Sequence, residues 1–108
     1  IEISSCGIGA RNGVPATTEA VLVMKNREID ISAHRSRACT REDVMESDLI
    51  LAMSQEHFTF ITSLVPAAKD KIRVLDIEDP IGMGLPKYEE VMVILDKKMK
   101  EIMPEVIA

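Results

Sequence analysis

The sequence predicts a three-layer α/β/α sandwich with a short parallel sheet, formed by one domain that spans residues 1–108. Two continuous apolar runs, Leu49–Met53 and Ile72–Leu75, are typical of strands that are buried on both faces of a parallel sheet. Segments with helical periodicity separate and follow these runs. Because strands that alternate with helices form parallel sheets, we expect helices on both faces of this sheet.

The first part of the chain is expected to contain a strand, a loop and a helix. Ile1–Ser5 alternates apolar and polar residues and then meets a loop with three glycines, which begins near Gly7. Thr17 or Thr18 can cap a helix over Glu19–Arg27, whose apolar residues lie on one face.

Two capping signals and one apolar stripe predict three more helices. The stretch Thr40–Asp43 has the pattern of a capping box and predicts a short helix through Ser47. Ser54 is expected to cap a helix that ends before Pro66. The last helix is predicted over 87–103. Its apolar stripe consists of Tyr88, Val91, Met92, Leu95, Met99, Ile102 and Met103.

Charge and cysteine usage narrow the classes of function. A formal net charge of −5 opposes binding to nucleic acid and to anionic membranes in general. No apolar run approaches the length that spans a membrane. Cys6 and Cys39 have neither metal-ligand spacing nor Cys-x-x-Cys spacing. We therefore expect free thiols, a cytoplasmic setting, and no metal ion or cofactor.

Asp79 and Pro80 are the strongest candidates for chemistry. They follow the predicted strand Ile72–Leu75 and precede a turn that contains two glycines. Proline biases the preceding residue toward an extended conformation and stiffens the loop. A carboxylate on a stiff loop beyond a strand end is well placed for proton transfer, whereas an ordinary Asp-Pro turn is the alternative interpretation.

The expected position of the site follows from the predicted sheet. Ligands in this architecture bind at the carboxyl ends of the strands. We expect three loops to converge there: Cys6–Pro15, the segment from Ser54 onward, and Asp76–Gly84.

Four stretches of the chain, taken together and in this order, resemble the low-molecular-weight protein tyrosine phosphatase family, which includes relatives that act on phosphoarginine and arsenate. The stretches are Ser4–Gly7 with the loop to Pro15 and Ala16, Asp30–Arg37 leading to Thr40–Asp43, Ser47–Met53, and Ile77–Pro80 with Gly82 and Tyr88. The resemblance covers essentially the whole chain. It implies a phosphotyrosine phosphatase I-like fold and hydrolysis of phosphomonoesters through a thiophosphate intermediate.

The resemblance also implies roles for individual residues. Asp79 is similar to the family's general acid, which protonates the leaving group and then activates water. Ser5 and His34 match positions that hold the phosphate loop by hydrogen bonds, although His34 could instead be an ordinary turn histidine. The positions implied for substrate binding are Arg11, Asn12 and Ile81.

Two of these positions differ from the family pattern. The family often has aromatic residues where this chain has Arg11 and Ile81, and those rings flank a phosphotyrosine ring. We therefore expect a phosphorylated protein or a small phosphomonoester as the substrate, with both phosphotyrosine and phosphoarginine open.

The family's first strand, Cys-x5-Arg phosphate loop and first helix have no counterpart in these residues. We expect a domain that is incomplete at its N-terminus and inactive alone. Cys6 and Arg11 form Cys-x4-Arg, one residue too short to close a phosphate cradle. Cys6 is therefore expected to be a small structural cysteine rather than the nucleophile, and Cys39 is also expected to be structural.

Three alternatives are weighed against this interpretation. A catalytically inactive binding or assembly module would self-associate through unpaired sheet edges. An arsenate reductase needs downstream cysteines, and the position expected for one reads Met53-Ser54. An unrelated nucleotide-binding domain is disfavoured because the chain has no Gly-x-Gly-x-x-Gly or Walker-type loop.

The segment that precedes the second predicted helix is basic. Its basic residues are Arg35, Arg37 and Arg41. They either steer anions toward the protein or form a solvated face that makes ion pairs with Glu42 and Asp43.

Overall fold

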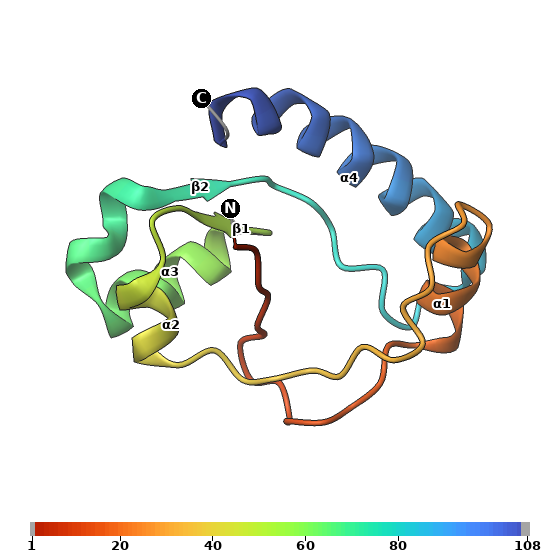
Figure 1. The fold of residues 1–108 in the computed structure, drawn as a ribbon, viewed down its shortest axis with the longest axis horizontal. Helices are drawn as coiled ribbons and strands as arrows, with labels where there is room; N and C mark the ends of the chain where they lie inside the picture. The colour runs from red at the N-terminus through yellow and green to blue at the C-terminus, as the bar shows by residue number, and fades with distance from the viewer. Residues whose placement is uncertain (1, 107–108) are drawn as a thin grey trace.

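The computed structural model describes residues 2–106. The elements follow in the order α1 (Thr18–Lys25), α2 (Arg41–Glu46), β1 (Ile50–Ala52), α3 (Gln55–Leu64), the 3-10 helix η1 (Pro66–Lys71), β2 (Ile72–Val74) and α4 (Leu85–Val106) (Figure 1). The two strands pair in parallel, with Ile50 opposite Ile72 and Ala52 opposite Val74. The predicted α/β fold with a short parallel sheet is confirmed.

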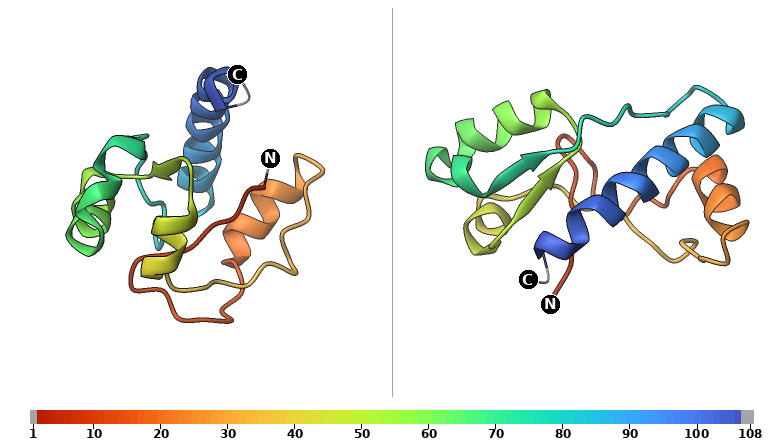
Figure 2. Two further views of the ribbon diagram at one scale, coloured as in Figure 1. Left: turned by 60° about the vertical axis from the view of Figure 1, so that its left-hand side comes forward. Right: turned by 90° about the horizontal axis from the view of Figure 1, so that it is seen from above.

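Hydrophobic clusters cover both faces of this sheet. Ile50 and Ala52 of β1 pack into a cluster with α2, α3 and η1, whereas Leu51 and Met53 pack into a second cluster with α4. Because successive side chains of a strand point to opposite faces, the two clusters lie on opposite sides. Figure 2 shows α3 and α4 on either side of the strands, which gives the three predicted layers.

The helix starts follow the capping signals of the sequence. The Thr17 hydroxyl accepts a hydrogen bond from the amide of Ala20 at 3.2 Å, and α1 begins at the next residue. Thr40 and Asp43 form the predicted capping box at the start of α2. Ser54 caps α3. These three predictions are confirmed. The sequence could predict the caps because each depends on contacts within one helical turn.

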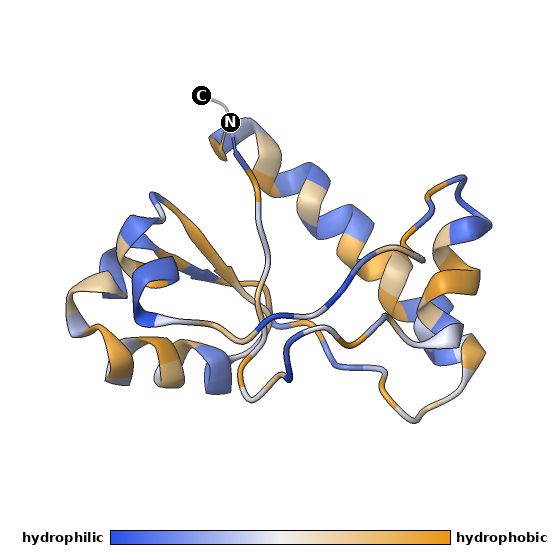
Figure 3. Cartoon of the chain, turned by 60° about the horizontal axis from the view of Figure 1, so that its bottom comes forward, coloured by the Kyte–Doolittle hydropathy of each residue, from blue (hydrophilic) through white to orange (hydrophobic). Residues whose placement is uncertain are grey.

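Helix α4 carries the predicted apolar stripe, and Figure 3 shows hydrophobic and hydrophilic residues alternating along it. Tyr88 and Val91 are its buried residues, and α1 packs against it. The helix is longer than predicted because Pro86 is tolerated in the first turn and Pro104 removes only one backbone hydrogen bond in the last turn.

One predicted strand does not form, and a second forms but is less buried than predicted. Residues 2–5 are exposed and form no strand; Ile1 lies outside the described residues. No strand of the described residues runs beside 2–5, and the first pairing along the chain is an isolated parallel bridge from Gly7 to Ala38. Strand β2 is not buried on both faces: Val74 is 37% exposed, since β1 is its one neighbour within residues 2–106 and β2 forms a sheet edge. The helix η1 was not predicted.

Among the described residues, no helix combines the length and the apolar character that crossing a membrane would require.

Candidate active site

The segment that leads from β2 to Asp79 is held by hydrogen bonds that continue the parallel ladder. The amide of Leu75 donates to the carbonyl of Ala52, and the amide of Ile77 donates to the carbonyl of Met53, both at 2.8 Å. The side chains of Leu75 and Ile77 are buried, at 4% and 5% exposure. Backbone and core therefore fix the chain up to two residues before Asp79.

Asp79 and Pro80 begin a tight turn. One carboxylate oxygen of Asp79, Oδ1, accepts a hydrogen bond from the amide of Ile81 at 3.0 Å. The carbonyl of Pro80 accepts one from the amide of Met83, and Gly82 between them has a φ of 75°. Within residues 2–106, Oδ2 of Asp79 has no hydrogen-bond partner. The turn thus orients the exposed carboxylate and leaves one oxygen open for chemistry.

A cleft of about 760 Å³ lies beside this turn. Its walls come from the residues after both strands, from the first turn of α3 and from α4: Met53, Ser54, Glu56, His57, Asp76, Ile77, Glu78, Asp79, Pro80 and Val91. Because Met53 follows β1 directly and Asp76 closely follows β2, the cleft is at the carboxyl ends of the strands, where this architecture binds ligands.

Ser5 and His34 line a second, smaller pocket of about 200 Å³. Its other walls are Cys6, Gly7, Ala10, Ser36 and Arg37. The structure therefore brings together the two residues expected to support a phosphate loop, although they come from segments far apart in the chain.

Arg11 and Asn12 lie on an exposed loop that is fastened to residues 36–38. The Ser36 hydroxyl donates to the Arg11 carbonyl and accepts from the amide of Val14. The Asn12 side-chain oxygen accepts from the amide of Ala38 at 2.8 Å. Ser36 was missed by the sequence analysis because a serine in a basic segment carries no signal for a partner so distant in the chain.

The expected meeting of three loops occurs for two of them. Ser54 and the segment from Asp76 share the larger cleft, whereas the walls that the Cys6–Pro15 loop contributes belong to the smaller pocket. Isolated bridges from Gly7 to Ala38 and from Pro15 to Arg35 hold this loop against the basic segment instead.

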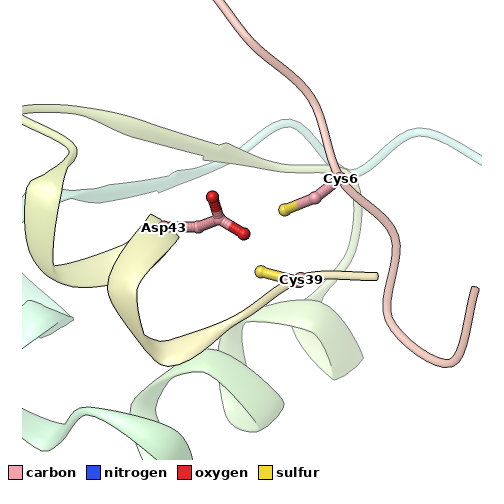
Figure 4. Close-up of side chains that lie close together, drawn as sticks. All are labelled: Cys6, Cys39 and Asp43. Atoms are coloured by element: carbon pink, nitrogen blue, oxygen red, sulfur yellow. The ribbon is translucent and has the colours of Figure 1, made fainter. Parts of the chain in front are cut away.

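Cys6, Cys39 and Asp43 point into one space between the N-terminal segment and α2 (Figure 4). Burial of the Cys6 thiol, its hydrogen bond with Cys39 and the negative charge nearby raise the pKa of Cys6 to about 12. Although residue 6 is exposed as a whole, its sulfur is turned toward these neighbours. A nucleophilic cysteine needs a lowered pKa, so this environment disfavours Cys6 as the attacking thiolate.

Asp43 forms an ion pair with Arg37, in which both carboxylate oxygens accept hydrogen bonds. Nη1 of Arg37 lies 2.9 Å from Oδ1 and 2.8 Å from Oδ2, and the amide and hydroxyl of Thr40 both donate to Oδ2. These hydrogen bonds, with that from Arg37 the strongest, lower the pKa of Asp43 to about 2. The predicted pairing of the basic segment with Asp43 is confirmed for Arg37, whereas Arg35 donates to two backbone carbonyls of its own turn.

Lys87 is a further residue that the sequence analysis missed. Its ammonium nitrogen lies 3.0 Å from the carboxylate of Glu78 and 3.4 Å from that of Glu90. The hydrogen bond from Lys87 to Glu78 raises the pKa of Lys87. The spacing of Lys87 and Glu90 signals the second pair, but only the fold brings Lys87 to Glu78, next to Asp79.

Comparison with known proteins identifies the family. The sequence model described as "Low molecular weight phosphotyrosine protein phosphatase" matches residues 1–108. The chain belongs to this family. The resemblance inferred from the sequence and the hydrolase class are confirmed. The protein is 34% identical over 112 residues to a probable low molecular weight protein-tyrosine-phosphatase, EpsP, of Ralstonia nicotianae, covering 98% of this chain and 77% of EpsP.

Further relatives differ in the phosphorylated residue that their names give. A protein-arginine-phosphatase of Geobacillus stearothermophilus is 30% identical, over 97% of this chain and 79% of that protein. A crystal structure of a low molecular weight protein tyrosine phosphatase from T. tengcongensis has a TM-score of 0.88 at 35% identity, covering 94% of this chain and 76% of that one. The tyrosine phosphatase Wzb of Escherichia coli K30 shares the fold, with a TM-score of 0.91 at 24% identity, covering 97% of this chain and 78% of that one.

Proposed function

We propose that the protein hydrolyses phosphomonoesters of proteins through a thiophosphate intermediate, with Asp79 as the general acid and base. The observation that carries this proposal is the position of Asp79. Its carboxylate borders the cleft at the carboxyl ends of both strands, with one oxygen held by the Ile81 amide and the other open. A positioned carboxylate of this kind is suited to transfer protons to and from a bound group.

The reaction has two steps. A cysteine thiolate attacks phosphorus and forms the S–P bond, while the bond from phosphorus to the leaving oxygen breaks and Asp79 gives that oxygen its proton. Water then attacks phosphorus, Asp79 takes a proton from it, and the S–P bond breaks to release phosphate and the thiolate. The two steps return Asp79 and the cysteine to their starting states.

The nucleophile of this proposal is the cysteine of a Cys-x5-Arg loop, which residues 1–108 do not contain. Ser5 and His34 would hold that loop, which is consistent with their place in one pocket. Cys6 is a poor substitute, because its pKa is raised and its spacing to Arg11 is one residue short. We therefore propose that the 108-residue polypeptide supplies the proton donor and the surrounding fold, and does not hydrolyse substrate alone.

The proposed substrate-binding residues suit a phosphorylated protein side chain. Ile81 is 65% exposed and offers an apolar contact within the Asp79 turn. Arg11 is exposed and can meet a second anionic group of a peptide. Asn12 uses its oxygen for Ala38 and keeps its side-chain NH2 group to donate. Because a related protein is named as an arginine phosphatase, phosphoarginine and phosphotyrosine are both substrates to test.

The proposal includes a cytoplasmic location. Both cysteines are free thiols, which fits a reducing cytoplasm.

The proposal also includes self-association of the chain. The two-stranded sheet of the described residues has open edges, which favour self-association. Sedimentation velocity at several protein concentrations measures this association directly.

The test compares the 108-residue polypeptide with the product of its complete reading frame. Both are assayed with p-nitrophenyl phosphate, a phosphotyrosine peptide and a phosphoarginine peptide. We expect no turnover by the 108-residue polypeptide and turnover by a product that carries a Cys-x5-Arg loop.

Hydrolysis by the 108-residue polypeptide that persists in the variant Cys6→Ser would overturn the assigned nucleophile. A complete product that has the loop but does not hydrolyse any of the three compounds would support the inactive binding module instead.

A further inference from the structure

Two thiols and a carboxylate from separate segments form a compact cluster. The sulfur atoms of Cys6 and Cys39 and a carboxylate oxygen of Asp43 all lie within 4.8 Å of one another. Figure 4 shows the three side chains converging from the N-terminal segment, from the residue before α2, and from α2 itself. The proposed phosphatase reaction uses none of these groups.

The spacing fits a tetrahedral metal ion. With Zn–S bonds of about 2.3 Å, two thiolates on one zinc ion stand about 3.8 Å apart, and a carboxylate oxygen stands slightly closer. We propose that Cys6, Cys39 and Asp43 bind a thiophilic divalent cation such as Zn²⁺, with the fourth position left to water. Cysteine and aspartate are ordinary zinc ligands, and thiolates select zinc over magnesium or calcium.

The carboxylate of Asp43 can bind a cation without leaving Arg37. Of its two oxygens, Oδ2 accepts from Arg37 and Thr40, whereas Oδ1 accepts only from Arg37 among the described residues. A carboxylate oxygen has two lone pairs, so Oδ1 has one left for a metal. Binding of the ion displaces the protons of both thiols to solvent. The two thiolates and one carboxylate then carry three negative charges, which a divalent ion and the Arg37 guanidinium balance.

The backbone that carries these ligands is already fixed. Gly7 donates to the carbonyl of Arg37 at 2.9 Å and accepts from the amide of Cys39 at 3.0 Å. The capping box of Thr40 holds Asp43. Because the supports of the ligands are hydrogen-bonded before any ion binds, little ordering cost opposes binding.

The same backbone pairing disfavours a disulfide. Gly7 lies opposite Ala38, so Cys6 and Cys39 are diagonal neighbours, offset by two residues. With strands about 4.8 Å apart and a rise of about 3.3 Å per residue, their Cα atoms would stand roughly 8 Å apart. A disulfide requires less than about 7 Å, whereas a shared metal ion spans the longer gap.

A bound ion would cross-link the N-terminal segment to α2. It would fasten the residue that follows Ser5 to the start of a helix, at one side of the smaller pocket. The positions of Cys6 and Cys39 in the chain follow no metal-binding spacing, so only the fold indicates this site.

The test uses the 108-residue chain, reduced with a phosphine and freed of metal. Zn²⁺ is titrated by calorimetry, and Co²⁺ is titrated while its thiolate charge-transfer band is recorded. We expect one ion per chain, a thiolate band with Co²⁺, and a melting temperature raised by roughly 10 °C at a free Zn²⁺ concentration about 100 times Kd. Cys6→Ser, Cys39→Ser and Asp43→Asn should each weaken binding, the cysteine variants by on the order of 100-fold.

His57→Gln is the matched control, since it changes a metal-binding side chain outside the cluster and should leave Zn²⁺ affinity unchanged. If a cluster variant does not fold, the Co²⁺ band of the unsubstituted chain shows whether the cysteines bind the ion. Cys6 and Cys39 are the sole cysteines of the sequence, so a thiolate band must come from them. The proposal is overturned by the absence of that band, by Zn²⁺ affinity that survives Cys6→Ser and Cys39→Ser together, or by one ion per two chains.

Discussion

The cleft beside Asp79 and the smaller pocket beside Cys6 are built by different means. The Asp79 segment, residues 75–83, continues a parallel sheet and buries Leu75 and Ile77 in the core. The Cys6 region, residues 5–15 with 34–43, has no strand and is held by isolated bridges, side-chain hydrogen bonds and the Arg37–Asp43 pair. The first is fixed by hydrophobic burial and the second by polar contacts near the surface.

The difference shows which part of the site tolerates change. Hydrophobic burial acts through many contacts and does not depend on protonation, so the Asp79 segment should keep its position whenever the sheet is folded. Polar contacts near solvent are individually weak and depend on protonation, so the Cys6 region should respond to single substitutions and to pH. Four experiments test this contrast.

The largest effect is expected from Asp79→Asn in a form of the protein that carries a Cys-x5-Arg loop. If Asp79 is the proposed proton donor, the substitution should lower kcat by roughly 100- to 10,000-fold without unfolding the sheet. Asp48→Asn, at the amino end of β1, is the matched control and should leave kcat unchanged. The loss should be larger for phenyl phosphate than for p-nitrophenyl phosphate, because the poorer leaving group needs the proton more. Equal losses for the two substrates would indicate that Asp79 acts only on structure.

The next largest effect is expected from Ile77→Ala. This side chain is 5% exposed and anchors the Asp79 segment in the core, so its truncation should lower the free energy of unfolding by about 2–4 kcal/mol. Ile81→Ala, in the same segment but 65% exposed, should change it by less than about 0.5 kcal/mol. Urea denaturation measures both variants, and similar losses in the two would contradict the assigned burial.

The Cys6 region should lose stability in acid through Asp43. Arg37 and Thr40 lower the pKa of Asp43 from 3.8 to about 2. A carboxylate whose pKa is lowered by folding stabilises the fold above its ordinary pKa and loses this contribution as the pH falls through the folded-state value. The difference in free energy of unfolding between the unsubstituted protein and Asp43→Asn should therefore shrink between about pH 4 and pH 2. Urea titrations with a chelator present measure this difference, and a constant value down to pH 2 contradicts the ion pair.

The smallest effect is expected from Ser36→Ala. The substitution removes two hydrogen bonds that fasten the loop of Arg11 and Val14, and should cost about 1 kcal/mol. Hydrogen exchange should show a faster amide at Val14, because its acceptor is lost. Ser4→Ala, on the exposed N-terminal segment, is the control and should leave that amide unchanged. Unchanged exchange in Ser36→Ala would mean that the loop is held by other contacts.

Sequence patterns predicted the helices and strands of both regions but not which segments would lie beside them in the fold. Thr17, Thr40 and Ser54 marked three helix starts, and the two apolar runs marked the strands. The strand over Ile1–Ser5 was predicted wrongly, because alternation shows that a segment can pair but not whether a partner lies beside it.

The sequence by itself determined the family, the helix caps, the apolar stripe of α4 and the stiff turn at Asp79, since each depends on residues within one or two turns of one another or on the order of motifs along the chain. The tertiary structure alone decided that Ser5 and His34 line one pocket, that Lys87 reaches Glu78, and that Cys6 faces Cys39. Such contacts join segments far apart in the chain, and their geometry is set by how the layers pack rather than by any local preference of the backbone.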